Sequence, residues 1–392
     1  MSSAAGASWE GSETPVYLDY NATTPVLPEV LEAMLPYLRQ HFGNPSSGHV
    51  FGVGARAGLE RARAQVAELL GCLPEEVVFT GGGTEANNLA IRGVAEATAR
   101  RRAVVTSPVE HPATAKPCAL LERQGWSVAR LPVDATGRVE LDGLAELLAG
   151  EPALVTLMHA NNEVGTLEPV AEVARRAREH GVLVHTDAAQ SVGKVPTRVD
   201  ELGVDLLSVA GHKLYAPKGV GALYVRRGTP LEPLVLGAGH ERGLRPGTEN
   251  VASIVALGQA CAIAQRDLEV EGARVRSLRE ALFARLSAAI PGVALNGHPV
   301  DRLPNTLNVR FPGVKGSALL AACASRLAAS TGSACHDGSE TPSAVLTAMG
   351  LAPEVALGSV RLSLGRLTSP EEVERAAAAL IQAFHALVAA RG

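Results

Sequence analysis

Between residues 75 and 225 the chain alternates short, continuous apolar runs with longer amphipathic segments. The apolar runs predict buried β-strands at Glu75–Thr80, Ala103–Ser107, Ala153–Met158, Val182–Asp187, Leu206–Ala210 and Gly221–Val225. The amphipathic segments predict helices over Thr84–Arg100, Ala113–Gln124 and Val170–His180. Strands that are buried on both faces and separated by helices form a mostly parallel sheet with helices on both sides. We therefore expect an α/β fold.

The pattern changes near residue 260. Long helices and shorter strands are expected beyond it, the helices at Ala260–Ile290 and Pro370–Ala390 and the strands at Thr306–Phe311 and Val360–Leu364. This pattern predicts a smaller α+β domain, and a length of 392 residues fits two domains. We expect a large domain over residues 17–260. Residues 1–16 and 261–392 would form the small domain, which would carry a loop at about 329–343.

Composition limits the binding partners and the cellular compartment that we expect for this protein. The 36 Lys and Arg residues against 40 Asp and Glu residues give a net charge of −4, which offers no electrostatic reason to expect nucleic acid or an anionic membrane as a partner. The five cysteines form no CxxC motif, which excludes a zinc knuckle. A disulfide framework is not expected in a chain of this size, which indicates a reducing compartment. Residues 1–15 contain no basic residue and no apolar core, so we expect no targeting signal and a cytoplasmic protein.

Polar and glycine-rich segments follow the predicted strands, and parallel sheets bind ligands at the carboxyl ends of their strands. The first such segment is Gly81-Gly82-Gly83-Thr84, which lies between a strand and a helix. Glycines allow close approach of the backbone, and a helix N-terminus attracts anions, so this segment can hold a phosphate. It matches neither of the common phosphate-loop patterns, and a plain tight turn is the alternative.

Lys213 and Asp187 follow two other predicted strands. A lysine at the ligand edge can form a Schiff base when it is desolvated, although a surface lysine is the alternative and Lys218 is a nearby rival. Asp187 can hold a pyridinium nitrogen in its protonated state, or can cap a helix. A reactive lysine, an acidic partner for a pyridine nitrogen and a phosphate seat are together the minimum set for pyridoxal phosphate (PLP). We therefore expect this cofactor.

Three further residues are candidates for chemistry. His111 follows a strand and could stack on a flat cofactor and move protons, whereas a lone histidine is otherwise structural. Cys335 lies in a loop rich in Gly and Ser, where an exposed thiol is expected to be used; the other cysteines are expected to be packed. Arg361 lies in an apolar strand and needs an anion, which can be a substrate carboxylate or a carboxylate of the protein.

Several of these residues belong to motifs that follow one another over almost the whole chain. In order, the motifs are YLDYNATTP (17–25), GNPSS (43–47), TGGGTEANN (80–88), EHPA (110–113), NNEVGT (161–166), HTDAAQSVGK (185–194), GHKLYAPKGVGALYVR (211–226), GAGHERGLRPGTEN (237–250), STGSACH (330–336) and VRLSLGR (360–366). On these motifs the chain resembles the cysteine desulfurases of the class V aminotransferase family. The resemblance implies a PLP-dependent transferase of fold type I.

The resemblance also implies a role for each matching residue. Lys213 would form the Schiff base and move the substrate's α-proton, and Cys335 would be the nucleophile. The cofactor would be held by Gly83, Thr84 and His212 at the phosphate, Gln190 and Asn162 at the phenolic oxygen, Asp187 at the pyridine nitrogen and His111 against the ring. Arg361, with Asn162, would bind the substrate carboxylate. Thr248 would reach the phosphate bound by the neighbouring subunit, so the active unit would be a homodimer.

The implied reaction converts L-cysteine into L-alanine and leaves a persulfide on Cys335, which then passes to a sulfur-acceptor protein. The acceptor and its pathway stay open, with iron–sulfur cluster assembly and tRNA thiolation among the routes. Ala210 departs from the family pattern, because bacterial housekeeping desulfurases have a serine there, and His336 follows the cysteine as in animal selenocysteine lyases. A selenocysteine lyase acting on L-selenocysteine is therefore an alternative. Another PLP enzyme, such as an aminotransferase or a β-lyase, and a catalytically silent partner are further alternatives.

Overall fold

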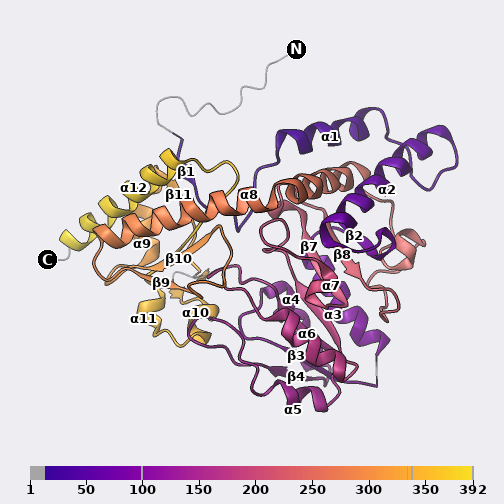
Figure 1. Ribbon diagram of the computed structural model, residues 1–392, viewed down its shortest axis with the longest axis horizontal. Helices are drawn as coiled ribbons and strands as arrows, with labels where there is room; N and C mark the ends of the chain where they lie inside the picture. Colours follow the sequence, from indigo (N-terminus) through magenta and orange to yellow (C-terminus); the bar gives the residue numbers. More distant parts are fainter. Residues whose placement is uncertain (1–13, 99, 333, 337–338, 391–392) are drawn as a thin grey trace.

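The computed structural model describes residues 14–98, 100–332, 334–336 and 339–390, and for 334–336 and 339–340 it describes the backbone alone. The helices of the first part of the chain are α1 Pro28–Arg39, α2 Val50–Leu70, α3 Gly83–Ala97, α4 Pro112–Arg123, α5 Leu144–Ala149, α6 Val170–Glu179, α7 Val199–Leu202 and α8 Val251–Ala289. Three single-turn 3₁₀ helices accompany them, η1 Pro74–Glu76, η2 Gly211–Lys213 and η3 His240–Gly243. Figure 1 shows how these helices surround a central sheet.

The central sheet has seven strands in the order β2-β8-β7-β6-β5-β3-β4. In that order the strands are Val77–Thr80, Gly221–Val225, Leu206–Ala210, Leu183–Asp187, Leu154–Met158, Ala103–Thr106 and Ser127–Arg130. The neighbours from β7 to β4 pair in parallel, whereas β8 runs antiparallel to both β2 and β7. The expectation of a mostly parallel α/β sheet is therefore confirmed. β4 is an additional strand that the apolar pattern did not predict.

Both faces of this sheet are buried, as the continuous apolar runs predicted. Alternate residues of each strand enter two separate cores. One core, which includes residues of α2, α6 and α8, takes Phe79, Val105, Val155 and Leu207. The opposite core, which includes residues of α3 and α4, takes their neighbours Val78, Val104, Leu154 and Leu206. A strand whose two faces are both covered is therefore mainly apolar along its length, as these strands are.

A smaller α+β unit lies beside the large sheet (Figure 1). Its strands are β1 Val16–Tyr17, β9 Ala294–Asn296, β10 Thr306–Arg310, β11 Leu327–Ala328, β12 Ala334–His336, β13 Ser339–Thr341 and β14 Ser359–Ser363. Its helices are α9 Gly316–Ala322, α10 Ala344–Ala348, α11 Pro353–Ala356 and α12 Pro370–Ala389. The antiparallel sheet β14-β10-β9 carries a core of its own, with Leu307 and Leu362 packed alongside Leu380.

The helix α8 belongs to both units and extends in Figure 1 from the small unit, beside α12, to the helices α1 and α2. Its residues up to Ala264 enter the core of the large sheet, and residues from Val275 to Leu286 enter the core of the small unit. The domain boundary expected at residue 260 lies inside this helix. Leu18, which the expected division assigned to the large domain, packs in the core of the small unit. The division of the chain into two folding domains stays a prediction.

The strand directions bring the ends of several strands to one edge. Because β2 and β7 both run antiparallel to β8, they run parallel to each other. The carboxyl ends of β2, β3, β5, β6 and β7 therefore meet at the same edge of the sheet, where ligands bind in folds of this kind. Within the described part of the chain, no helix combines the length and the apolar content that crossing a membrane would require.

Candidate active site

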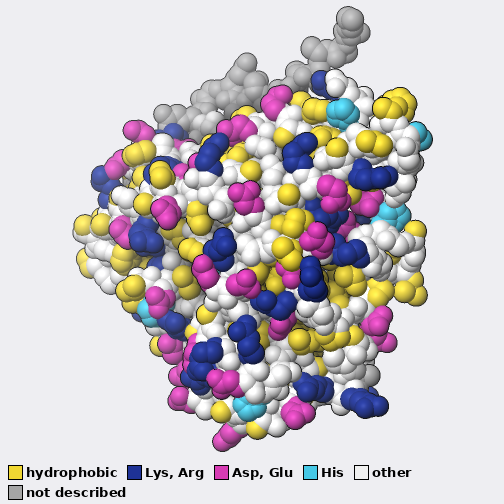
Figure 2. Space-filling view, turned by 45° about the vertical axis from the view of Figure 1, so that its right-hand side comes forward, with side chains coloured by type: hydrophobic (Ala, Val, Ile, Leu, Met, Phe, Trp, Pro, Cys, Tyr) yellow, Lys and Arg dark blue, Asp and Glu magenta, His cyan; other side chains and the backbone are white. Residues whose placement is uncertain are grey.

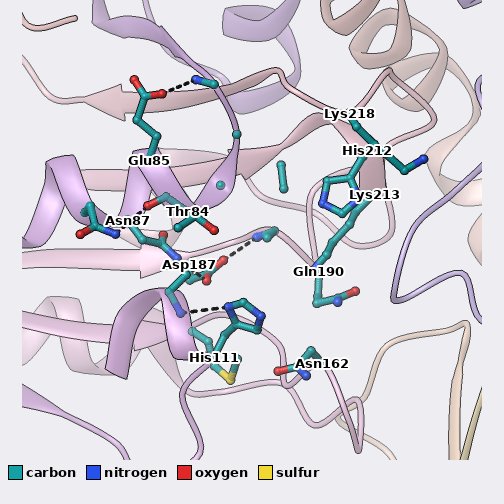
Figure 3. A pocket seen from close by; sticks show the side chains of 18 of the residues that line it. Thr84, Glu85, Asn87, His111, Asn162, Asp187, Gln190, His212, Lys213 and Lys218 are labelled. Atoms are coloured by element: carbon teal, nitrogen blue, oxygen red, sulfur yellow. Dashed lines mark hydrogen bonds between the residues drawn. The ribbon is translucent and has the colours of Figure 1, made fainter. Parts of the chain in front are cut away.

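A pocket of about 970 Å³ opens at this edge of the sheet. It is lined by the sequence-predicted residues Gly83, Thr84, His111, Asn162, Asp187, Gln190, His212, Lys213 and Arg361. Figure 3 shows Lys213 and Gln190 across the pocket from Asp187 and Thr84. Thr248 does not line this pocket and is exposed in the loop before α8. The side chain of Cys335 lies outside the described residues.

Asp187 is held rigidly at the end of β6. Its Oδ1 accepts a hydrogen bond of 2.9 Å from the backbone N–H of Ala189, and its Oδ2 accepts one of 2.6 Å from Asn87 Nδ2 (Figure 3). A turn follows Asp187, so the alternative that it caps a helix is wrong. Asn87 was not singled out from the sequence. Two donors, one to each carboxylate oxygen, fix the orientation of the Asp187 side chain.

Lys213 follows β7 as the last residue of the turn η2. Enclosure by the surrounding protein lowers the pKa of its amine, nearby Arg361 lowers it further, and Asp187 acts in the opposite sense. Such an amine loses its proton more readily than an exposed lysine, and the neutral amine is the nucleophile that Schiff-base formation needs. The rival Lys218 also lines the pocket, but it is exposed and its position is at the rim.

His111 caps helix α4. Its Nδ1 accepts a hydrogen bond of 3.1 Å from the backbone N–H of Ala113 (Figure 3). Burial lowers the pKa of the imidazole, and Lys213 lowers it further against the opposing effect of Asp187. The ring is therefore neutral, with its hydrogen on Nε2. His111 can therefore cap the helix and also face the pocket, because the cap uses Nδ1 and leaves Nε2 available.

The glycine-rich segment forms the N-terminus of α3 at one side of the pocket. Gly82 has a φ of 146°, which favours glycine. A Cβ placed on Gly83 would lie 3.0 Å from the Cβ of Ala210, so these two residues are in close contact.

His212 also lines the pocket. Its Nδ1 lies 3.2 Å from Thr23 Oγ1, and burial together with Lys213 and Lys218 lowers the pKa of His212 to about 4.

Arg361 on β14 brings a positive charge from the small unit into the pocket. Its guanidinium donates to Asp19 Oδ1 at 2.8 Å and to the backbone oxygen of Asn162 at 3.0 Å. The anion that this arginine needs is thus supplied in part by a protein carboxylate. The Nε of Arg361 is buried and has no partner among the described residues. Part of its donor capacity is therefore unused.

The other cysteines have the surroundings expected of packing residues. Cys118, Cys261 and Cys323 are buried, and Cys72 is half-buried. Burial raises the pKa of Cys72, Cys118 and Cys261 to about 12, so these residues are thiols and weak nucleophiles near neutral pH.

These residues fit PLP in their chemistry. The pocket combines an amine of lowered pKa, a fixed carboxylate and a glycine-lined helix N-terminus. Two buried polar atoms of its lining, Asn87 Oδ1 and Arg361 Nε, have no hydrogen-bond partner in the described part of the chain. Buried polar atoms are nearly always paired, so unpaired ones in a pocket are typical of a site that receives a polar ligand.

Two residues near the pocket escaped the sequence interpretation although both lie in quoted motifs. Asn21, in YLDYNATTP, lines the pocket, and Lys194 closes HTDAAQSVGK. Lys194 Nζ donates to Gln190 Oε1 at 3.0 Å and to Asn21 Oδ1 at 3.3 Å. Membership of a long motif was the available signal, but spacing alone could not show that the turn folds Lys194 back toward Asn21.

The fold and the pocket together define a PLP-dependent enzyme of fold type I. The aminotransferase class-V family model matches residues 16–376. Cysteine desulfurase IscS of Dictyoglomus turgidum is 47% identical over 360 residues, which cover 91% of each chain. Cysteine desulfurase NifS of Azotobacter vinelandii is 47% identical and covers 92% of this chain and 90% of its own. A solved NifS-like protein superposes with a TM-score of 0.88 at 38% identity, covering 95% of this chain and 99% of its own.

The chain therefore belongs to the aminotransferase class-V family and, within it, to the PLP-dependent cysteine desulfurases. The resemblance found from the motifs and the expected cofactor are both confirmed. The relatives named here do not favour the selenocysteine lyase alternative.

Proposed function

We propose that Lys213 is the amine that binds PLP in this cysteine desulfurase, and that Cys335 receives the sulfur of L-cysteine. The observation that carries the proposal is the location of Lys213 in one pocket with Asp187, under conditions that lower the pKa of its amine. When bound, PLP supplies an electrophilic carbon for amines and a ring that accepts electrons. Substrate binding, proton transfer and the attack on sulfur are proposed for side chains of this chain.

The cofactor-binding residues act by orientation. Asp187 would face the pyridine nitrogen, Gln190 and Asn162 the phenolic oxygen, and His111 the ring. Gly83, Thr84 and His212 would hold the phosphate. The hydrogen bonds to both carboxylate oxygens support this role for Asp187, because they hold the carboxylate in one orientation.

Arg361 is proposed to bind the carboxylate of L-cysteine, together with Asn162. Its unpartnered Nε supports this role, because a bidentate contact with a carboxylate uses two N–H groups of one guanidinium. Asp19 accepts from the same guanidinium and holds it in place. The substrate is thereby fixed at its carboxylate, and its amine is directed toward Lys213.

Lys213 Nζ is proposed to take the α-proton of the substrate and to return a proton to carbon later. The thiolate Sγ of Cys335 attacks the substrate sulfur, forming an S–S bond as the substrate C–S bond breaks. The electron pair of the broken bond stays with the carbon fragment, which takes up a proton and leaves as L-alanine. The persulfide on Cys335 then passes to a sulfur-acceptor protein. No external oxidant is needed for this balance.

The Cys335→Ala variant tests the persulfide step, with Cys72→Ala as the matched control. We expect the Cys335 variant to keep the visible absorption of bound PLP and to release no sulfide from L-cysteine. The Cys72 variant should keep both properties, because its half-buried thiol has a pKa of about 12. Full sulfide release by the Cys335 variant would reject the persulfide mechanism. Turnover of L-selenocysteine beside L-cysteine, measured on the same preparation, tests the alternative, and a strong preference for selenocysteine would support it.

The active unit is proposed to be a homodimer in which Thr248 reaches the partner's phosphate site. An exposed apolar patch supports this proposal: Phe42, Val50, Phe51 and Val53 are exposed, and the rings of Phe42 and Phe51 stack at 5.5 Å. Figure 2 shows hydrophobic side chains exposed along the upper right of the molecule, over α1 and α2. An exposed apolar cluster is typical of a protein interface.

Mixing two inactive variants tests the contribution of Thr248 across the interface. In a mixed dimer of Lys213→Ala and Thr248→Ala subunits, one site has its own Lys213 and receives Thr248 from its partner. We therefore expect activity to return on mixing. Failure to regain activity in mixed dimers, verified by mass, would show that Thr248 acts in the site of its own subunit.

A cytoplasmic location is likewise proposed, on the grounds of composition alone.

A further inference from the structure

Lys194 lies next to residues that line the active-site pocket, at the end of the turn that follows β6. Its amine donates to two side-chain amides, Gln190 Oε1 at 3.0 Å and Asn21 Oδ1 at 3.3 Å. Both amides are buried and both line the active-site pocket. Lys194 itself does not line that pocket; it lines a small adjoining cavity of about 40 Å³, which Lys213 also lines.

The partners of Gln190 fix the orientation of its amide. The amine of Lys194 can donate to an amide oxygen, and when it is protonated it can only donate. On the other side, Gln190 Nε2 donates at 2.9 Å to the backbone oxygen of Asn21, which can only accept. Rotation of the amide by 180° would place a donor against Lys194 and an acceptor against a carbonyl. One orientation of Gln190 is therefore strongly favoured.

This orientation leaves one N–H of Gln190 Nε2 without a use in the contacts described above. An amide nitrogen carries two hydrogens, and the bond to Asn21 uses one of them. Because Gln190 lines the pocket, the second hydrogen is available to a ligand there. Without Lys194, only the bond to the Asn21 backbone oxygen would hold this orientation, so the flipped amide, which presents an acceptor to the pocket, would become more populated.

Asn21 extends the same network to the substrate side. Its Nδ2 donates to Thr306 Oγ1 at 2.8 Å and to the backbone oxygen of Asn162 at 3.2 Å. That backbone oxygen also accepts from Arg361. Lys194 thus contacts an amide, that of Asn21, which connects the turn after β6 with the small unit, so a change at Lys194 reaches both sides of the pocket.

We propose that Lys194 is a positioning residue, which fixes the Gln190 amide so that its N–H faces the ring oxygen of PLP. The proposal rests on the role proposed for Gln190. The charged groups that act on the pKa of Lys194 are Lys213 and Arg361. The titratable side chains that also line its cavity are Tyr20, Tyr215, Glu271 and Arg366. Burial, with Lys213 and Arg361, lowers the pKa of Lys194 to about 7, and the neutral amine still donates to both amides.

A double-mutant cycle tests this proposal. The variants are Lys194→Met, which removes the donor at similar volume, Gln190→Met, and the two combined; Lys315→Met, at an exposed lysine, is the matched control. The readouts are the dissociation constant of PLP from the apoprotein and the wavelength and pH midpoint of the visible absorption band. We expect each single variant to weaken PLP binding about tenfold, the loss typical of one hydrogen bond to a charged group, and to raise the midpoint. The combined variant should be no worse than Gln190→Met.

Two results would overturn the proposal: Lys194→Met behaving like the Lys315→Met control, or the losses multiplying to about a hundredfold in the combined variant. Unfolding of the apoprotein, followed by circular dichroism, shows whether Lys194→Met folds, and Lys194→Leu, which removes the same donor, replaces it if it does not. If the unsubstituted protein forms no visible band with PLP, the proposed function fails and the role of Lys194 fails with it, whereas a normal band together with an unaffected Lys194→Met variant overturns the role of Lys194 alone. The two failures are therefore distinguishable.

Discussion

Replacing Asn87 by leucine separates the role of this residue in the site from its role in folding. Asn87 is buried, and its Nδ2 donates at 2.6 Å to Asp187 Oδ2. Leucine has a similar shape and no donor. Hydrogen bonds to charged groups contribute about 1.5–3 kcal/mol, which corresponds to about 10- to 100-fold in an equilibrium constant. We expect PLP to bind more weakly by this factor, because Asp187 loses one of its two anchors.

The stability of the apoprotein should change much less. Asn87 Oδ1 is buried and has no partner among the described residues, so the leucine variant also removes an unsatisfied acceptor, which costs about 1–3 kcal/mol in the unsubstituted protein. The two contributions to the free energy of unfolding oppose each other. PLP titration and thermal unfolding of the apoprotein measure both quantities, and Asn296→Leu, at a buried asparagine of the small unit that does not line the pocket, is the control. A large drop in apoprotein stability with unchanged PLP affinity would refute this reasoning.

Three further changes have defined outcomes. Ala210→Ser adds a hydroxyl beside Gly83 and should tighten PLP binding about 2- to 10-fold by titration, while unchanged or weaker binding would contradict its placement at the phosphate. Gly332→Ala would place a Cβ against Glu163 Oε2, which also accepts from Ser343 Oγ, in the loop that is proposed to carry the nucleophile. Sulfide release should therefore fall about tenfold with the visible band unchanged, and full activity would show that the Glu163 side chain moves aside. Burial raises the pKa of Glu110 from 4.5 to about 8, so the folded protein retains a proton that the unfolded chain releases. Relative to Glu110→Gln, the protein should therefore lose stability as pH rises from about 4.5 to about 8, and parallel unfolding curves across this window would show that the carboxyl is not protonated.

Most of the central sheet was predictable because its inner strands are short and mainly apolar. Alternate residues enter opposite cores, so a strand such as Leu154–Met158 is buried on both faces and shows neither the polar stripe of a surface helix nor the polar run of a loop. The strand Ser127–Arg130 escaped prediction because it pairs with one neighbour alone and none of its residues is fully buried. The extent of α8 could not be read from the pattern, since its apolar face changes from one core to the other along its length.

The site was predictable as far as strand ends determine it. Asp187 and Lys213 follow neighbouring parallel strands, and that alone places them at one edge of the sheet. The partners that hold them could not be predicted, because they come from distant segments: Asn87 is 100 residues from Asp187, and Asp19 is 342 residues from Arg361. Hydrogen bonds between such segments depend on the packed structure and leave no periodic signal.

The central claim is that PLP is bound through Lys213, and peptide mapping after borohydride reduction tests it most directly. Reduction makes the bond between the cofactor and the lysine permanent, and mass spectrometry of the digested protein then locates it. We predict that the label is on Lys213. A label on Lys194 or Lys218, the other lysines around the pocket, or the absence of any label after incubation with PLP, would contradict the account.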